Sequence, residues 1–501
     1  MVNKIRYSKK AIFYSGLFSI SLLSCTHEDQ PNIILFVVDD MGWTDTSVPF
    51  YSLETPNNQY LNTPNMEWLA SKGMKFTNAY AASPVSSPTR SSLLTGMNPA
   101  RSHITNWIVG EGEQSADINT HLIPNWNSDG VNSTNNPLPM VLKANGYQTA
   151  HIGKAHFGKK GTEGANPLNL GFDYNIGGHH KGHPASYYVP YGKEDSDAKV
   201  PHLEQFYADS LYLTDALTFK ALELIEKMAS QKDEKPFFLN MAHYAVHTPI
   251  QGDMSLIEKY EREDKNKFAQ QYATMIESMD KSLGDIVKKL QELGIDDNTI
   301  ILFMSDNGGL VAHSGPPTTN FPLSSGKGSS HEGGTRVPMI VYWPGVVQGN
   351  TICDEPVISD DFYPTVLKMA KIKSIKEYTV NIDGKDISGL LKQTGDFERN
   401  DAIYWHYPHY WANLEMRQAD TTIHPYSAIR DGDWKLIYNY NNEFVELYNL
   451  MEDIGEATNL SKAEPEKAKD FCHKLSAYLR KVDAQLPINR VTNKEVPYPH
   501  F

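Results

Sequence analysis

The sequence predicts an α/β fold: a largely parallel sheet covered by helices, followed near the C-terminus by a smaller antiparallel sheet. Three largely apolar runs, at 32–38, 236–241 and 299–304, are typical of strands buried on both faces. Near residue 393 the composition changes to Tyr, Trp, His and Asn with polar turns. The chain has 501 residues and 40% hydrophobic content, enough for a large and a smaller core. We therefore predict a large domain over 26–392 and an α+β subdomain over 393–501.

The first 25 residues have the pattern of an export signal. Basic residues at 4, 6, 9 and 10 precede an apolar stretch, 11–23, that is too short to span a bilayer as a helix. The string Leu22-Leu23-Ser24-Cys25 resembles a bacterial lipobox. We expect a lipoprotein-type signal over 1–25, lipid on Cys25, and a location in the periplasm or on the outer membrane and cell surface. The alternative is a plain cleaved secretory signal.

Charge and cysteine content limit the partners. A net charge of -14 argues against nucleic acid and against an anionic membrane surface, so membrane contact is expected only through a lipid anchor at Cys25. The other two cysteines, Cys353 and Cys472, fit no metal-site spacing. They are either a disulfide pair or two separate thiols, and the sequence does not distinguish these alternatives.

The remaining elements follow from periodicity and end signals. Helices are predicted at 65–71 and at 138–144, the second closed by Gly146, and a strand at 147–152. An apolar stripe with spacings of three and four predicts one long helix from Phe268 to Leu293, closed by Gly294. The segments 426–430 and 433–438 predict a hairpin, 443–450 a strand and 465–482 a closing helix.

Acidic residues follow two of the buried strands. Asp39 and Asp40 come directly after the first run, and Asp306 and Asn307 come after the third. The carboxyl ends of strands are where α/β sheets place ligands, and carboxylate and amide oxygens suit Ca²⁺ or Mg²⁺ better than Zn²⁺. The simpler reading of a lone Asp-Asp is a solvated turn, and the second acidic strand end weakens it.

The segment 83–96 reads as a loop that runs into a helix. Pro88 fits the first helical turn and Gly96 fits the end. Ser86 then lies at the helix N-terminus, where free N–H groups favour an anion, and Arg90 projects from the same face. A hydroxyl and a fixed cation thus converge on one small anionic group.

This string resembles the signature of the sulfatase family, in which a Cys or Ser, a variable residue, Pro, a small residue and Arg precede a Leu-Thr-Gly helix end. Three further strings resemble family motifs, in family order. They are Gly153-Lys154-Ala155-His156, His247-Thr248-Pro249 and the Gly326-Lys327-Gly328 segment that continues to Glu332-Gly333-Gly334. The last segment is too rich in glycine for us to expect regular structure there. Ala155 departs from the Trp of many members, which changes the pocket wall and not the chemistry.

The resemblance implies an alkaline phosphatase-like fold, with a mixed sheet between helices and a small antiparallel sheet attached, and it implies a set of functional residues. The catalytic residues that the resemblance implies are Ser86, Arg90, Lys154, His156, His247 and Lys327. The implied ligands of Ca²⁺, or alternatively of Mg²⁺, are Asp39, Asp40, Ser86, Asp306 and Asn307. Ser86 is implied to be oxidised to formylglycine by a serine-type sulfatase maturase. Its hydrate attacks sulfur with Asp306 as proton acceptor, Lys154 and Lys327 hold the sulfate, His247 with Lys327 assists the departing alcohol, and His156 deprotonates the second hydroxyl.

The expected substrate is a sulfated glycan, with sulfated galactose or N-acetylgalactosamine as candidates. Aromatic and histidine side chains near the motifs are the predicted sugar contacts: His103, Trp107, His179, His180, Trp405 and His406. The loop 177–202 is read as solvated or substrate-contacting rather than as a zinc site. Two alternative functions remain: a phosphonate or phosphate ester hydrolase, and a non-catalytic sulfated-glycan binding protein in which Ser86 is not converted.

Overall fold

The computed structural model describes residues 30–108, 121–124, 129–231, 235–311, 317–395, 397, 399–410 and 423–501. The predicted signal and Cys25 lie outside these residues. Within the described part of the chain, no helix is both long and apolar enough to cross a bilayer.

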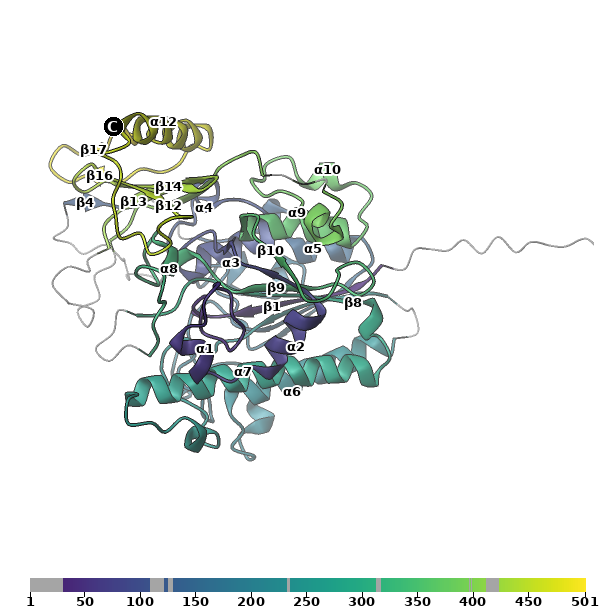
Figure 1. Ribbon diagram of the computed structural model, residues 1–501. Coiled ribbons are helices and arrows are strands. Elements are labelled where there is room, and N and C mark those ends of the chain that lie inside the picture. Colours follow the sequence, from purple (N-terminus) through teal and green to yellow (C-terminus); the bar gives the residue numbers. More distant parts are fainter. Residues whose placement is uncertain are drawn as a thin grey trace, which may run out of the picture.

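An eight-stranded sheet forms the centre of the molecule (Figure 1). Its strands in spatial order are β10 (Thr351–Cys353), β2 (Met74–Phe76), β9 (Met339–Tyr342), β8 (Thr299–Ser305), β1 (Asn32–Val38), β7 (Phe237–Ala242), β5 (Gln148–Gly153) and β6 (Tyr174–Ile176). Strand β1 pairs in parallel with β7 and β8 over its length, so the ends of all three lie together. The sheet is mixed rather than wholly parallel, because β9 runs antiparallel to both β8 and β2.

Helices cover both faces of this sheet (Figure 1). One face packs against α2 (Pro64–Lys72), α6 (Leu213–Ala229) and α7 (Lys267–Glu292), and the other against α3 (Ser86–Thr95), α5 (Leu138–Ala144) and α9 (Phe362–Met369). Alternate residues of β1 enter the two cores, with Ile34 and Phe36 in one and Ile33 and Leu35 in the other. This is why the whole run is apolar: neither face of the strand meets water.

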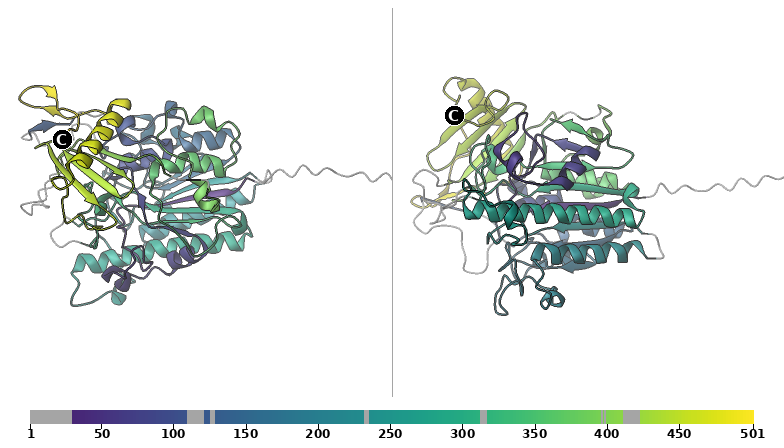
Figure 2. Two further views of the ribbon diagram at one scale, coloured as in Figure 1. Left: turned by 45° about the horizontal axis from the view of Figure 1, so that its top comes forward. Right: turned by 60° about the horizontal axis from the view of Figure 1, so that its bottom comes forward.

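The C-terminal part forms a second layer of its own (Figure 2). A four-stranded antiparallel sheet contains β12 (Ile403–Tyr407), β13 (Tyr426–Asp431), β14 (Trp434–Asn439) and β15 (Phe444–Asn449), and α12 (Pro465–Lys481) packs on it. Two small sheets join β3 (Ala79–Tyr80) to β11 (Val357–Ile358), and β4 (Leu122–Ile123) to β16 (Ile488–Asn489) and β17 (Lys494–Glu495). The remaining short α-helices are α1 (Pro56–Tyr60), α4 (Pro99–Ser102), α8 (Glu332–Thr335), α10 (Ile375–Tyr378) and α11 (Ser388–Lys392).

The predicted α/β class, strands and principal helices are confirmed, and so is the mixed sheet that the family resemblance implies. Two details differ. First, residues 332–335, expected to lack regular structure, form one helical turn closed by a 2.8 Å bond from the Arg336 N–H to the Glu332 carbonyl. Second, Phe268, predicted to face the core, is 39% exposed because it lies in the first turn of α7. Cys353 and Cys472 are free thiols in this structure, and the domain boundary at 392 stays a prediction.

Candidate active site

The functional residues expected from the sequence meet at the carboxyl end of the central sheet. Asp39 and Asp40 leave β1, Asp306 and Asn307 leave β8, and Lys154 leaves β5. Helix α3 points its first turn at the same edge, and its end is set by Gly96, whose φ of 68° favours glycine. The parallel register of these strands therefore brings together residues that are more than 200 positions apart in sequence.

Ser86 lies at the centre of this group. It is the first residue of α3 and is 3% exposed. Its Oγ is 3.0 Å from the Asp39 Oδ1 and 3.3 Å from the Asn307 Oδ1, and the Lys154 Nζ donates to it at 2.9 Å. The side chain is thus held between oxygen acceptors and one ammonium donor.

Arg90 fixes the opposite side of the site. Its Nε donates to the Asp306 Oδ2 at 2.7 Å, and its Nη1 donates to the Lys154 carbonyl at 2.8 Å. The Nη2 is buried and makes no hydrogen bond within the described residues, and the Asp39 Oδ1 is 3.9 Å from it. A buried guanidinium N–H without a partner is costly, so this group is suited to an anionic ligand.

Asp40 organises the remaining residues. The Lys327 Nζ donates to its Oδ2 at 2.6 Å, and the Asn307 Nδ2 donates to its Oδ1 at 2.8 Å. The His247 Nε2 is 3.7 Å from the same Oδ2, while the His247 Nδ1 donates to the Thr248 carbonyl at 2.8 Å. In the neutral ring this tautomer leaves Nε2 as an acceptor.

The electrostatics reflect crowded buried charges. Burial, reinforced by repulsion from Asp306, raises the pKa of Asp39 to about 8. Burial also acts to raise the pKa of Asp40 and of Asp306, but Lys327 beside the first and Arg90 beside the second hold both pKa values below the usual range. Burial, followed by the Lys327 charge, lowers the pKa of His247 well below its usual value, so this imidazole is neutral at pH 7.

The donor set fits a divalent cation. Asp39, Asp40 and His247 each place one ligand atom within 4.8 Å of the others, and the oxygens of Asp306 and Asn307 adjoin them. Asp39, Asp40 and Asp306 form ion pairs with Arg90, Lys154 and Lys327. A divalent cation would favour the ionised form of all three carboxyls, Asp39 included, and would give the cluster a net positive charge that suits a monoanionic sulfate ester.

Two expected contacts with Ser86 are not made. Asp39, and not Asp306, lies within hydrogen-bonding distance of the hydroxyl, because both Asp306 oxygens accept other bonds, from the Asp40 N–H and from Arg90. This makes Asp39 a second candidate for the role of proton acceptor expected for Asp306, and that role stays a prediction. His156 directs its Nε2 at the Ile108 carbonyl (2.8 Å) and its Nδ1 at the Ser87 Oγ (3.0 Å), one residue past Ser86.

The predicted sugar contacts fall into two groups. His179 and His180 lie in the loop that borders the site: the His179 carbonyl accepts from the His156 N–H at 3.1 Å, and the His180 Nε2 is 3.0 Å from Asp197. Trp107 is half-buried and packs against the core below β12.

The other group does not reach the site. Trp405 is 0% exposed and donates its Nε1 to the Ala81 carbonyl, and His406 is 2% exposed and bonded to Ser427 and Gln485. We therefore correct the expectation that these two side chains contact substrate, because both are buried and bonded elsewhere. His103 contacts the Asp483 carbonyl at 2.8 Å and is not buried, so its role stays a prediction.

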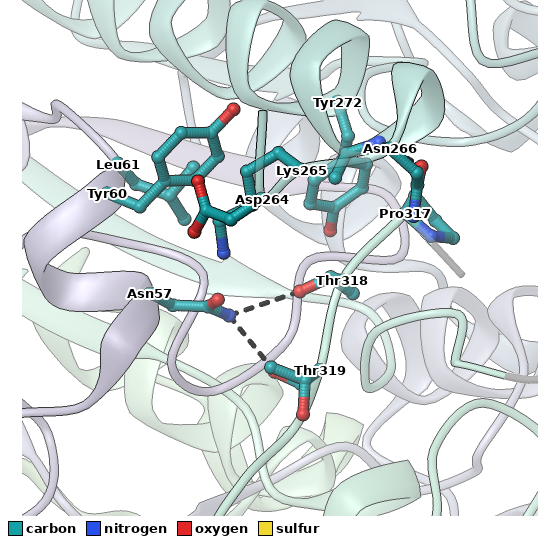
Figure 3. A pocket seen from close by; sticks show the side chains of 11 residues that line it. Asn57, Tyr60, Leu61, Asp264, Lys265, Asn266, Tyr272, Pro317, Thr318 and Thr319 are labelled. Carbon is teal, nitrogen blue, oxygen red and sulfur yellow. Dashed lines mark hydrogen bonds between the residues drawn. The ribbon is translucent and has the colours of Figure 1, made fainter. Parts of the chain in front are cut away.

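A cavity of about 210 Å³ lies between α1, α7 and the segment 317–319 (Figure 3). Tyr272 lines it, and the Tyr272 hydroxyl contacts the Asp45 Oδ2 at 2.7 Å and the Asp40 carbonyl at 3.3 Å. Asn57, across the cavity, donates to the Asp45 Oδ1 and to Thr318. Buried Asp45 thus supports the backbone that carries Asp40, a role with no signal in the sequence beyond an acidic residue in the following turn.

Sequence reasoning also left one residue of the bordering loop without a role. The His183 ring lies parallel to that of His247, with centroids 6.3 Å apart and an interplanar angle of 11°. Its position in a run of histidines was the available signal, but the run alone does not show which ring faces the site.

Comparison with known proteins gives consistent matches. A sequence model described as "Sulfatase" matches residues 31–372, and one described as "N-sulphoglucosamine sulphohydrolase, C-terminal" matches residues 326–485. A protein of Formosa agariphila named "Sulfatase" is 30% identical over 100% of this chain and 98% of its own length. The N-acetylgalactosamine-6-sulfatase of Mus musculus is 30% identical over 74% of this chain and 68% of its own length.

Among solved structures, Ps i-CgsB in complex with k-i-k-neocarrahexaose superposes with a TM-score of 0.73 at 28% identity. The superposition covers 90% of this chain and 93% of that one.

Proposed function

Since the chain belongs to the sulfatase family, with its alkaline phosphatase-like fold and sulfuric ester hydrolase activity, we propose that it removes sulfate from a glycan and that Ser86 works as formylglycine. The observation that carries this proposal is the setting of Ser86, whose Oγ lies between Asp39, Asn307 and Lys154 with the unpartnered Arg90 Nη2 nearby. A glycan is supported by two similar proteins, one named for N-acetylgalactosamine and one bound to a carrageenan-type hexaose.

Formylglycine supplies, as its hydrate, one hydroxyl that attacks sulfur and a second whose deprotonation expels sulfate. A divalent cation held by Asp39, Asp40, Asp306 and Asn307, with Ca²⁺ proposed and Mg²⁺ the alternative, supplies charge stabilisation for the sulfuryl oxygens. An unmodified serine has only one hydroxyl and would retain the sulfate.

The protein's own side chains then orient the ester and move protons. Arg90, Lys154 and Lys327 each pair with a carboxylate of the site, and they are the proposed holders of the sulfuryl oxygens. Lys327 is the proposed donor to the departing alcohol, because the neutral tautomer of His247 presents an acceptor at Nε2. Asp39 is the proposed acceptor of the first proton, since its Oδ1 is the nearest carboxylate oxygen to Ser86 and a bound divalent cation would hold this carboxyl ionised.

His156 is the proposed base for the second proton. Its ring is neutral, because burial, followed by the Lys154 charge, lowers its pKa well below the usual value. Its Nδ1 is the accepting nitrogen and faces Ser87, the residue next to Ser86.

The rest of the proposal concerns maturation and location. A serine-type sulfatase maturase is required to oxidise Ser86, and Cys25 carries lipid after export to the periplasm or outer membrane. Labelling of the chain by a fatty acid, and its loss in Cys25→Ala, tests the lipid anchor; a chain labelled equally without Cys25 contradicts it.

The test of function is sulfate release from a panel of sulfated oligosaccharides by protein produced with an active maturase. We expect release from at least one glycan, and reduction to background in Ser86→Ala. Ser91→Ala is the matched control, because Ser91 is equally buried in α3 and its hydroxyl has no partner among the described residues. Binding of the panel without sulfate release would overturn the proposal in favour of a binding protein.

The second candidate function is hydrolysis of phosphonate or phosphate esters, and kcat/KM on matched pairs of substrates distinguishes it from sulfatase activity. Matched sulfate and phosphate monoesters of one sugar are to be compared under the same conditions. We expect kcat/KM to favour the sulfate ester, and a higher value for the phosphate ester would reverse the assignment.

A further inference from the structure

One short segment, 178–183, borders both histidines of the site. The His156 N–H donates to the carbonyl of His179 at 3.1 Å, and Gly182 packs so closely that a Cβ there would lie 2.3 Å from the His156 Cε1. His183 follows directly and stacks in parallel on His247. The segment therefore forms a wall of the site, and glycine at 182 lets that wall approach.

His183 is the histidine of this wall that presents a free nitrogen. Its Nδ1 donates to the Pro184 carbonyl at 3.2 Å, so in the neutral ring Nε2 is the acceptor. Nothing in the described chain donates a hydrogen bond to this Nε2, and the residue is exposed. The neighbouring rings differ, because His180 is bonded to Asp197, while the Nε2 of His179 has no partner among the described residues but is buried.

The surroundings keep this ring neutral. Partial burial, together with the charges of Lys154, Lys181 and Lys327, lowers the pKa of His183 below its usual value. A neutral imidazole with a lone pair at Nε2 does not attract the sulfate group, which the arginine and lysines hold. Its complement is a hydrogen-bond donor close to the ester, and the hydroxyls of a sugar ring are such donors.

We propose that His183 is a substrate-recognition residue, whose Nε2 accepts a hydrogen bond from a hydroxyl of the sugar that carries the sulfate ester. The position follows from the stacking, because His247 lies beside Lys327, the proposed donor to the departing sugar oxygen. The His183 imidazole, stacked on His247, would then lie beside the sugar-ring atoms next to that oxygen. This inference rests on the proposed glycan sulfatase activity and extends it to one side chain and one class of contact.

The test combines substitution of His183 with removal of single hydroxyls from the substrate. The kcat/KM for a sugar sulfate is compared with that for analogues deoxygenated at each hydroxyl flanking the ester, in the unsubstituted enzyme and in His183→Ala. We expect the unsubstituted enzyme to prefer one hydroxyl-bearing sugar by about tenfold over its deoxy analogue, the size of one neutral hydrogen bond. His183→Ala should lose that preference, and His183→Gln, which retains an acceptor, should recover part of it.

Controls separate recognition from support of His247. His473→Ala removes an exposed histidine on α12 and should leave the preference intact. The inference is overturned if His183→Ala lowers kcat/KM equally for every analogue, which indicates a structural role, or if it changes nothing. Failure of the proposed function itself is distinct: the unsubstituted enzyme would then release no sulfate from any sugar in the panel.

Discussion

Lys435 carries the most demanding structural prediction. It lies on β14 with 0% exposure, and its Nζ contacts the Glu332 Oε1 at 2.8 Å and the Glu456 Oε1 at 3.0 Å. Glu332 has further partners in Tyr80 and Arg336, whereas the Glu456 Oε2 accepts only the Glu332 N–H among the bonds described. Removing the ammonium therefore leaves Glu456 as a buried carboxyl without a cationic partner.

Lys435→Met keeps the length of the side chain and removes its charge. Breaking a buried ion pair by deleting one partner costs about 3–5 kcal/mol. A chain of this size shifts its melting temperature by about 1 °C per kcal/mol, so we expect a fall of about 3–5 °C in thermal unfolding. Burial and repulsion from Glu332 already raise the pKa of Glu456 to about 7, and its protonation limits the loss.

The double variant Lys435→Met/Glu456→Gln tests this reasoning. It replaces the unpaired buried carboxyl, so we expect it to be more stable than Lys435→Met, with a coupling free energy between the two substitutions of about 1–3 kcal/mol. The reasoning is wrong if Lys435→Met costs less than about 1 kcal/mol, or if the double variant is no more stable. The cluster also matters for function, because Glu332 belongs to the segment that carries Lys327.

Three further predictions follow from the same structure. Burial lowers the pKa of His243 to about 3, so between about pH 3 and pH 6.5 the unfolded chain binds a proton at this residue and the folded chain does not. The free energy of unfolding therefore falls as the pH is lowered through this window. In urea titrations His243→Gln should reduce the dependence of the free energy of unfolding on pH by about 1.4 kcal/mol per pH unit, and an unchanged dependence would contradict this. Chelation of divalent cations should abolish sulfate release, and Ca²⁺ should restore it while Zn²⁺ does not, because the donors are hard oxygens; full activity after exhaustive chelation would argue against the metal. Trp405→Phe should lower the free energy of unfolding by about 1–3 kcal/mol through loss of its bond to Ala81 and leave KM unchanged, whereas a raised KM would return Trp405 to the substrate cleft.

Much of the site follows from strand ends. The runs 32–38 and 299–304 are apolar on both faces, which identifies buried parallel strands, and the ends of adjacent parallel strands lie together. The convergence of Asp39, Asp40 and Asp306 is therefore predictable from sequence. The direction of β9 is not, because an apolar run of four residues is compatible with either orientation.

Side-chain partners were the less predictable part. Trp405 alternates with polar neighbours along β12, a pattern shared by residues that line a cleft and residues that fill a core. Its burial depends on Tyr80, more than 300 positions away, whose ring lies 5.3 Å from it. The choice between Asp39 and Asp306 as the neighbour of Ser86 likewise depends on Arg90, which occupies one carboxylate and leaves the other facing the hydroxyl.

The central claim, that Ser86 becomes the nucleophile, is tested most directly by the mass of the peptide Phe76 to Arg90. The protein is to be produced beside a maturase shown to act on a control substrate. We predict a loss of two hydrogens from Ser86, or the mass of the corresponding hydrate. An intact serine in a preparation that releases sulfate from glycans would contradict the account.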